Sequence, residues 1–367
     1  MRINSINKNS FNGYDARPLK GFFMGSNSHN LAREIQNIGY KEGFKVFSKQ
    51  KTSLQNNCGE CIPDLIPSNN TELWAQDVWT FLKNKLISNF NDTDNITISN
   101  YFGIEKEASK EHVAGGNFFI VDNNGSDELF IGENSLNSLQ TLTIKDIEKK
   151  FNVKKVFVLP QMDFHIDLFM RPLDNKNILL ADDNLTLKIL EDGYEKLLDY
   201  ISAKHAEDDP MATCIKDCFL SQIFKFRMMY NNNINPQADK IAEIIKNAGY
   251  NPIRVPGRIY TVTNFADKML FLSHDCNYIN AAVIKNENDE IIYITNKSNI
   301  DKMLGLETGF AKDFDFRFEK EFIKSIEPYV NPDKIYFVNG DNDYISKVML
   351  KGMQGGVHCI CSEIPNK

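Results

Sequence analysis

The stretch FFIVDNNGSDELFIGENSLNSLQTLTIKDIEKKFNVKKVFVLP, residues 118–160, decides the fold class. Its two short apolar runs, Phe118–Val121 and Leu129–Ile131, are separated by an Asn-Asn-Gly turn signal, which is typical of a β-hairpin. Residues 143–151 are then expected to be helical, and Lys155–Pro160 is a further apolar strand that is ended by its proline. The order predicts a hairpin, a helix and a third strand, which together make a ββαβ unit.

The same order of elements returns near the C-terminus without repeating the residues themselves. The elements expected there are two paired strands, a helix and a closing strand, at Ile279–Ile284, Ile291–Thr295, Phe316–Tyr329 and Lys334–Val338. Near the N-terminus we expect a strand, a helix and a strand at Gly21–Gly25, Asn30–Tyr40 and Lys45–Ser48. An order of elements that recurs over roughly seventy residues indicates an α/β fold built from repeated units.

The region that follows the first unit departs from this rhythm. Leu185–Leu220 is expected to be mostly helical, with Leu197, Tyr200 and Ile201 on one face. We therefore expect a helical insertion at about residues 185–250. No linker rich in proline, glycine or serine divides the chain, so residues 1–367 are expected to form a single domain.

The composition limits the classes of function that the chain can have. It has 367 residues, 42% of them hydrophobic, and a net charge of −7. The lack of a basic footprint argues against a nucleic-acid partner, and no apolar run is long enough to cross a membrane. The N-terminal MRINSINKNSFNGYD has no apolar core of a secretory signal, and the seven cysteines lack a compact disulfide spacing. We expect reduced thiols in the cytoplasm, with export as an effector without an N-terminal signal left open.

The strongest local motif is G-G-V-H-C, which ends at Cys359. Two glycines before a cysteine allow unusual backbone angles and a close approach to a ligand. The alternative is a buried terminal strand in which Cys359 is a small hydrophobic side chain.

A second motif, H-x-D, follows the strand that ends before Pro160. Residues two apart in an extended segment face the same side, so His165 and Asp167 are expected to point together. The alternative is an ordinary solvated strand end.

Two further motifs precede it. W-x-Q-D runs from Trp74 to Asp77 in a segment that holds both tryptophans of the chain, and its alternative is an amphipathic segment with Asp77 exposed. G-G-N is a turn that ends at Asn117 and opens a strand.

Taken in order, W-x-Q-D, G-G-N, H-x-D and G-G-x-H-C resemble the motifs of the guanidine-modifying (pentein) superfamily. That superfamily includes agmatine deiminases, peptidyl-arginine deiminases and amidinotransferases. The likeness runs from Trp74 to Pro365, and the forms of the first and last motifs are most similar to protein-arginine deiminases. The resemblance implies a pseudo-fivefold α/β propeller of ββαβ repeats, which agrees with the repeated order of elements.

The resemblance also implies the roles of individual residues. Cys359 would be the nucleophile, His165 the general acid and base, and Asp77 and Asp167 the carboxylates that grip the guanidinium. Asn117 would be structural or would stand behind the site. The substrate-binding residues that the resemblance implies are Asp77, Asp167, Asn280, Asn117 and Trp74.

These residue types suit attack on a guanidinium carbon. A guanidinium stays charged and delocalised, and two carboxylates can hold its N–H groups by charge-assisted hydrogen bonds. The nucleophile must be a thiolate, and a neighbouring cation, either the substrate or protonated His165, would lower the pKa of the Cys359 thiol. His165 can protonate the departing ammonia and then accept a proton from water. No metal or other cofactor is needed.

The chain departs from the family pattern in three respects. Cys361 stands two residues after the nucleophile, where the family usually has threonine. The Trp-rich N-terminal stretch of agmatine deiminases has no counterpart. The immunoglobulin-like domains of vertebrate protein-arginine deiminases are missing, so their calcium dependence is not assumed.

Other polar residues are not expected to take part in catalysis or metal binding. Cys58 and Cys61 have the spacing of half a zinc site, but no second pair follows at a matching distance, so no metal site is expected. His112 and His358 lack a sequence argument for catalysis. Each of the three arginines that could contact a substrate carboxylate is expected to form a structural salt bridge instead: Arg171, Arg254 and Arg258.

The sequence therefore predicts a cysteine-dependent hydrolase. It would convert the guanidinium of an arginine side chain in a peptide or protein to a ureido group, so that the residue becomes citrulline. Ammonia would be released through a covalent thiouronium intermediate. The alternatives are an agmatine deiminase, an amidinotransferase in which an amine replaces water, and an idle protein that only binds a guanidinium-bearing partner.

Overall fold

The structure is a computed structural model of the 367-residue chain. It describes residues 19–24, 29–44, 46–48, 59–61, 115–123, 125–138, 142–151, 153–206, 208–230, 235–266, 269–286, 288–311, 313–353 and 355–365. The W-x-Q-D motif, with Trp74 and Asp77, lies outside these residues, as do Cys58 and His112.

The fold is mixed α/β with several small sheets, and none of the sheets formed by the described residues closes on itself. Three sheets are built alike: an antiparallel hairpin is followed by helices and by a third strand parallel to the second. Their strands are β4 (Phe118–Asp122), β5 (Asp127–Gly132) and β6 (Lys155–Leu159); β7 (Met170–Pro172), β8 (Asn177–Ala181) and β9 (Asn251–Val255); and β12 (Ala282–Lys285), β13 (Ile291–Asn296) and β14 (Ile335–Val338). The ββαβ order predicted near residues 118–160 and again near the C-terminus is confirmed.

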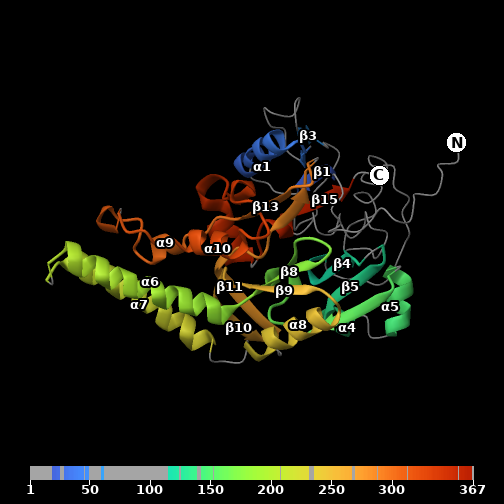
Figure 1. Cartoon of the computed structure of the whole chain (residues 1–367), viewed down its shortest axis with the longest axis horizontal. Coiled ribbons are helices and arrows are strands. Elements are labelled where there is room, and N and C mark those ends of the chain that lie inside the picture. The colour runs from blue at the N-terminus through green and yellow to red at the C-terminus, as the bar shows by residue number, and fades with distance from the viewer. Residues whose placement is uncertain are drawn as a thin grey trace.

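Two further sheets complete the described strands. β1 (Leu19–Met24) pairs antiparallel with β15 (Cys361–Pro365) and parallel with β2 (Val46–Ser48), so the first and last described strands lie side by side (Figure 1). β2 also pairs parallel with β3 (Gly59–Cys61). The remaining sheet is the antiparallel pair β10 (Arg258–Ala266) and β11 (Met269–Asn277).

Helices lie between the strands, and the helices expected at Asn30–Tyr40, at residues 143–151 and at Phe316–Tyr329 are present. They are α1 (His29–Glu42), α4 (Glu133–Ser138), α5 (Ile144–Phe151), α6 (Asp183–Lys204), α7 (Pro210–Tyr230), α8 (Asn235–Asn247), α9 (Ile300–Met303) and α10 (Phe318–Ile326). The helical character expected after residue 185 is confirmed by α6, α7 and α8. Figure 1 shows α6 and α7 packed together and extending away from the sheets, and the rings of Tyr194 and Phe219 lie 5.8 Å apart between them.

Local signals account for the edges of these elements. The turn between β4 and β5 is closed by two backbone hydrogen bonds between Asn123 and Ser126, and Gly125 has φ = +84°, a conformation that glycine adopts without strain. At the start of α6, the Asp182 side chain accepts a hydrogen bond of 2.9 Å from the Leu185 N–H. Such a cap satisfies one of the free N–H groups at the end of a helix and stabilises it by about 1 kcal/mol.

Among the described residues, the buried apolar side chains form two clusters, and the smaller one includes Val357 and Cys359 of the G-G-V-H-C motif. In this smaller cluster, Leu31 and Ile35 of α1 are grouped with Ile284 of β12 and with Val357 and Cys359. Burying each such aliphatic side chain is worth about 1.5–3 kcal/mol. This apolar packing helps to hold the backbone around Cys359 in place.

Candidate active site

Cys359 lies in a 3₁₀ turn, His358–Ile360, directly before β15, and not inside the terminal strand. Its side chain is completely buried. The sulfur lies 3.6 Å from Nδ2 and 3.7 Å from Oδ1 of Asn280, and 3.9 Å from Oδ2 of Asp167. Three of the residues chosen from the sequence thus meet at one sulfur atom.

The H-x-D segment is not extended, so the expectation that His165 and Asp167 share a side by strand alternation is wrong. Residues Ile166–Leu168 form a 3₁₀ turn, in which successive side chains point about 120° apart. Asp167 is completely buried and reaches the sulfur, whereas His165 stands before the turn, partly exposed, with its ring 4.6 Å from that of Phe164. The structure therefore places Asp167 in contact with the Cys359 sulfur, and it places His165 just before the turn that carries Asp167.

Asn117 explains why the chain turns at this point. Its Oδ1 accepts hydrogen bonds from the Ile166 N–H at 3.0 Å and from Nε2 of Gln161 at 2.8 Å, and its Nδ2 donates to Oγ of Ser135 at 2.7 Å. A Cβ on the neighbouring Gly132 would lie 2.3 Å from that Oδ1. Through these hydrogen bonds, Asn117 stabilises the turn that carries Asp167.

Asn277 ties the turn of Asp167 to that of Asn280. Its Nδ2 donates to the Leu168 carbonyl at 3.0 Å, and its Oδ1 accepts from the N–H groups of Ile279 and Asn280, both at 3.1 Å. The Asn280 Nδ2 in turn lies 3.4 Å from the Asp167 carbonyl. Asn277 lies three residues before Asn280, and no sequence pattern marked it as a site residue.

Asn296, at the end of β13, links the Asn280 turn to the segment that precedes Cys359. Its Nδ2 donates to the Asn280 carbonyl at 3.0 Å, and its Oδ1 accepts from the Val357 N–H at 2.7 Å. A Cβ on Gly356 would lie 2.4 Å from the Asn296 amide, so the second glycine of G-G-V-H-C is needed for this close approach. Gly356 does not have a positive φ, so this glycine serves the close contact with Asn296 and not a left-handed backbone conformation.

His358 also belongs to this cluster, although no sequence pattern had indicated a role for it. Its Nδ1 lies 2.7 Å from Oδ2 of Asp167, and its ring centroid lies 5.9 Å from that of Phe119. Adjacent residues of an extended segment point to opposite sides, so His358 and Cys359 could not both face Asp167 from a strand. The 3₁₀ turn makes it possible.

Burial and charge act together on the thiol. Burial raises the pKa of Cys359 well above its ordinary value, and the nearby carboxylate of Asp167 raises it further. The thiol is therefore held in its protonated form at neutral pH in this arrangement. A cation placed beside both groups would oppose these effects and favour the thiolate.

The three arginines have structural partners. Arg258 is completely buried, with Nη2 2.9 Å from Oδ2 of Asp183. Arg254 lies 3.1 Å from Asp182, so both form the expected salt bridges. Arg171 is buried, with its guanidinium 5.6 Å from the centre of the Phe119 ring.

The structure gives no sign of a metal site or a membrane span within its described part. No group of three or more His, Cys, Asp or Glu side chains there could hold a metal ion. Cys214 and Cys218, four residues apart on α7, are exposed free thiols. No helix among the described residues is long and apolar enough to cross a membrane.

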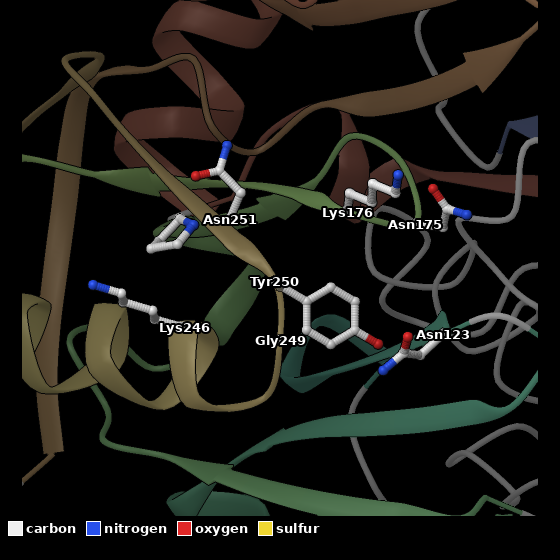
Figure 2. Close-up of a pocket in the computed structure, with 8 residues that line it drawn as sticks. Asn123, Asn175, Lys176, Lys246, Gly249, Tyr250 and Asn251 are labelled. Atoms are coloured by element: carbon white, nitrogen blue, oxygen red, sulfur yellow. The ribbon is translucent and has the colours of Figure 1, made fainter.

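A polar hollow of about 560 Å³ lies away from this cluster (Figure 2). It is lined by Asn123, Asn175, Lys176, Lys246, Gly249, Tyr250, Asn251 and Pro252. Asn117 and Asn123 stand at opposite ends of β4, which is five residues long, so roughly 17 Å of strand separates the hollow from the turn of Asp167. None of the candidate site residues that the structure describes lines it.

Comparisons with known proteins bear on the fold. No family model matches the sequence, and no curated protein matches it. Among solved structures, the chain is similar to the agmatine deiminase of C. jejuni, with 15% identity, a TM-score of 0.53 and coverage of 96% of this chain and 95% of that one. A substrate-bound variant of the C. jejuni agmatine deiminase has 14% identity, a TM-score of 0.52 and coverage of 96% and 95%.

A candidate peptidyl-arginine deiminase is similar to the same degree, with 13% identity, a TM-score of 0.52 and coverage of 96% of this chain and 98% of that one. At these identities the likeness shows the fold alone. In fold, the chain is similar to these deiminases.

Proposed function

We propose that this chain is a hydrolase of the deiminase type, in which Cys359 attacks the carbon of a guanidinium group and ammonia is released. The observation that carries the proposal is the meeting of Cys359 with Asp167 and Asn280, which lie 192 and 79 residues away along the chain. Burial and the carboxylate of Asp167 disfavour the thiolate of Cys359, and a cation bound beside both groups would offset that effect. A guanidinium is such a cation, and its flat N–H fork matches a carboxylate.

The residues present suggest how the reaction would run. The guanidinium would bind to the carboxylate of Asp167, and to that of Asp77, and its charge would lower the pKa of the Cys359 thiol. The thiolate would add to the central carbon, and His165 would give a proton to the departing nitrogen, which leaves as ammonia. Water activated by the same histidine would then add to the S-alkylthiouronium carbon, and expulsion of the thiolate would leave a ureido group.

For the substrate, we propose the arginine side chain of a peptide or protein. The forms of W-x-Q-D and G-G-V-H-C support this choice, and one structural neighbour carries the name of a peptidyl-arginine deiminase. Agmatine is the second candidate, because two neighbours are agmatine deiminases. An amidinotransferase would share every residue named so far and differ only in the second nucleophile.

The overall arrangement is part of the same proposal. Three ββαβ sheets and the sheet in which β1 joins β15 support a pseudo-fivefold propeller in one catalytic domain, with a helical insertion at about residues 185–250. The exposed free thiols Cys214 and Cys218 suit a reducing compartment such as the cytoplasm.

Ammonia release tests the proposal. The purified chain would be offered a peptide with an internal arginine, agmatine and free arginine together, with and without an added amine, and mass spectrometry would follow the replacement of NH by O. Consumption of the peptide first supports the preferred substrate, and consumption of agmatine first replaces it with the second candidate. An amidino-amine product would identify a transferase, and binding without turnover would identify an idle guanidinium-binding protein.

A further inference from the structure

The polar contact between His358 and Asp167 has no part in the reaction steps given above. The distance from Nδ1 of His358 to Oδ2 of Asp167 is 2.7 Å, and both side chains are buried. The same Oδ2 lies 3.9 Å from the Cys359 sulfur. One carboxylate oxygen is therefore shared between the candidate nucleophile and the residue directly before it in the chain.

The geometry decides which nitrogen of His358 carries a hydrogen. A carboxylate oxygen can only accept, so Nδ1 must be the donor, either in the neutral ring or in the charged one. The Phe119 ring, with its centroid 5.9 Å away and its plane tilted by 45°, packs beside the imidazole. The donor is thus held in one place by packing on one side and by its own backbone turn on the other.

We infer that His358 is a positioning residue that holds the carboxylate of Asp167 beside the Cys359 sulfur through its Nδ1–H, so that Asp167 meets the guanidinium in a fixed orientation. The inference rests on the proposed function for the identity of the substrate. The contact also links the 3₁₀ turn of Cys359 to the 3₁₀ turn Ile166–Leu168. Loss of this donor would remove one of the contacts that orient the carboxylate toward the substrate carbon.

Asparagine and glutamine provide a matched pair of substitutions for this donor. An asparagine amide places its N–H near the position of the histidine Nδ1, whereas a glutamine amide reaches the position of Nε2. We expect His358→Gln, and the apolar His358→Phe, to lower kcat/KM by about tenfold to thirtyfold, mostly through kcat. We expect His358→Asn to recover most of that loss. A merely structural role would lower thermal stability in all three variants without separating kcat from KM.

A second measurement does not depend on turnover. In a Cys361→Ser background, the rate of Cys359 alkylation by iodoacetamide would be followed against pH by peptide mass spectrometry. Removal of the donor leaves the Asp167 charge less neutralised, so the alkylation curve of His358→Gln and His358→Phe should move to higher pH. The curve of His358→Asn should stay close to that of the parent.

The two measurements separate the failure of this inference from the failure of the proposed function. If no guanidine is consumed but the alkylation curves divide as expected, the positioning role stands and the proposed function falls. If guanidine is consumed while His358→Asn behaves like His358→Gln and His358→Phe in both assays, the positioning role is overturned. Should His358→Phe fail to fold, the comparison of Asn with Gln decides the question.

Discussion

Replacing Asp167 by asparagine should separate substrate turnover from thiol reactivity. The substitution keeps the shape of the side chain and removes its negative charge. In the parent chain, Oδ2 of Asp167 lies 3.9 Å from the Cys359 sulfur. Loss of a charge-assisted contact to the guanidinium costs about 2–3 kcal/mol, so kcat/KM should fall by roughly 30-fold to 150-fold. The kinetics of turnover alone would therefore show only a loss of catalytic efficiency.

The thiol should respond in the opposite sense. Two unit charges at 3.9 Å interact by about 4 kcal/mol at an effective dielectric constant of about 20. This repulsion disfavours the thiolate and contributes to the raised pKa of Cys359, so its removal must lower that pKa. Asp167→Asn should therefore be alkylated at Cys359 by iodoacetamide at lower pH than the parent chain, although it turns over less substrate.

The assay is the rate of alkylation at a series of pH values, read at Cys359 by peptide mass spectrometry. Asp199→Asn, which removes an exposed carboxylate on α6, is the control and should change neither curve nor turnover. An alkylation curve of Asp167→Asn that stays in place or moves to higher pH would refute the reasoning, because the sulfur and the carboxylate would then not be neighbours.

Three other substitutions test separate parts of the account. Cys359→Ser should abolish ammonia release with the fold intact, because a hydroxyl is a far weaker nucleophile, while Cys361→Ser keeps activity; the reverse result would mean that the wrong thiol was chosen. His165→Ala should lose turnover in the same ammonia assay, and normal turnover would remove it from the mechanism. Gly356→Ala should lower the free energy of unfolding in urea by about 1–3 kcal/mol, because its Cβ would lie 2.4 Å from a side-chain amide. Gly309→Ala, where no atom lies within 4 Å of the added Cβ, is its control and should be neutral.

Much of the fold could be predicted from the sequence because its signals are local. The hairpin of β4 and β5 was marked by an Asn-Asn-Gly turn, and Gly125 adopts the positive φ that such a turn needs. The ββαβ order near residues 279–338 was visible from apolar runs alone. The helices after residue 185 were expected for the same reason.

The shape of the site depends on contacts between distant residues, and the sequence could not supply it. The turn at Ile166–Leu168 was read as extended because its cause, the bond from the Ile166 N–H to Asn117, spans 49 residues. No sequence argument gave His358 a catalytic role, because its contact with Asp167 spans 191 residues. The role of Asn296 depends on a bond to Val357 across 61 residues. Trp74 and Asp77, outside the described residues, stay predictions.

The most direct test of the central claim is to trap the covalent intermediate. Turnover mixtures of the parent chain and of His165→Ala with a guanidine substrate would be quenched in acid, digested and mapped by mass spectrometry. The account predicts an adduct on Cys359 with the mass of the substrate less ammonia, more abundant in His165→Ala. Ammonia release with the adduct on another residue, or with no adduct in either protein, would contradict it.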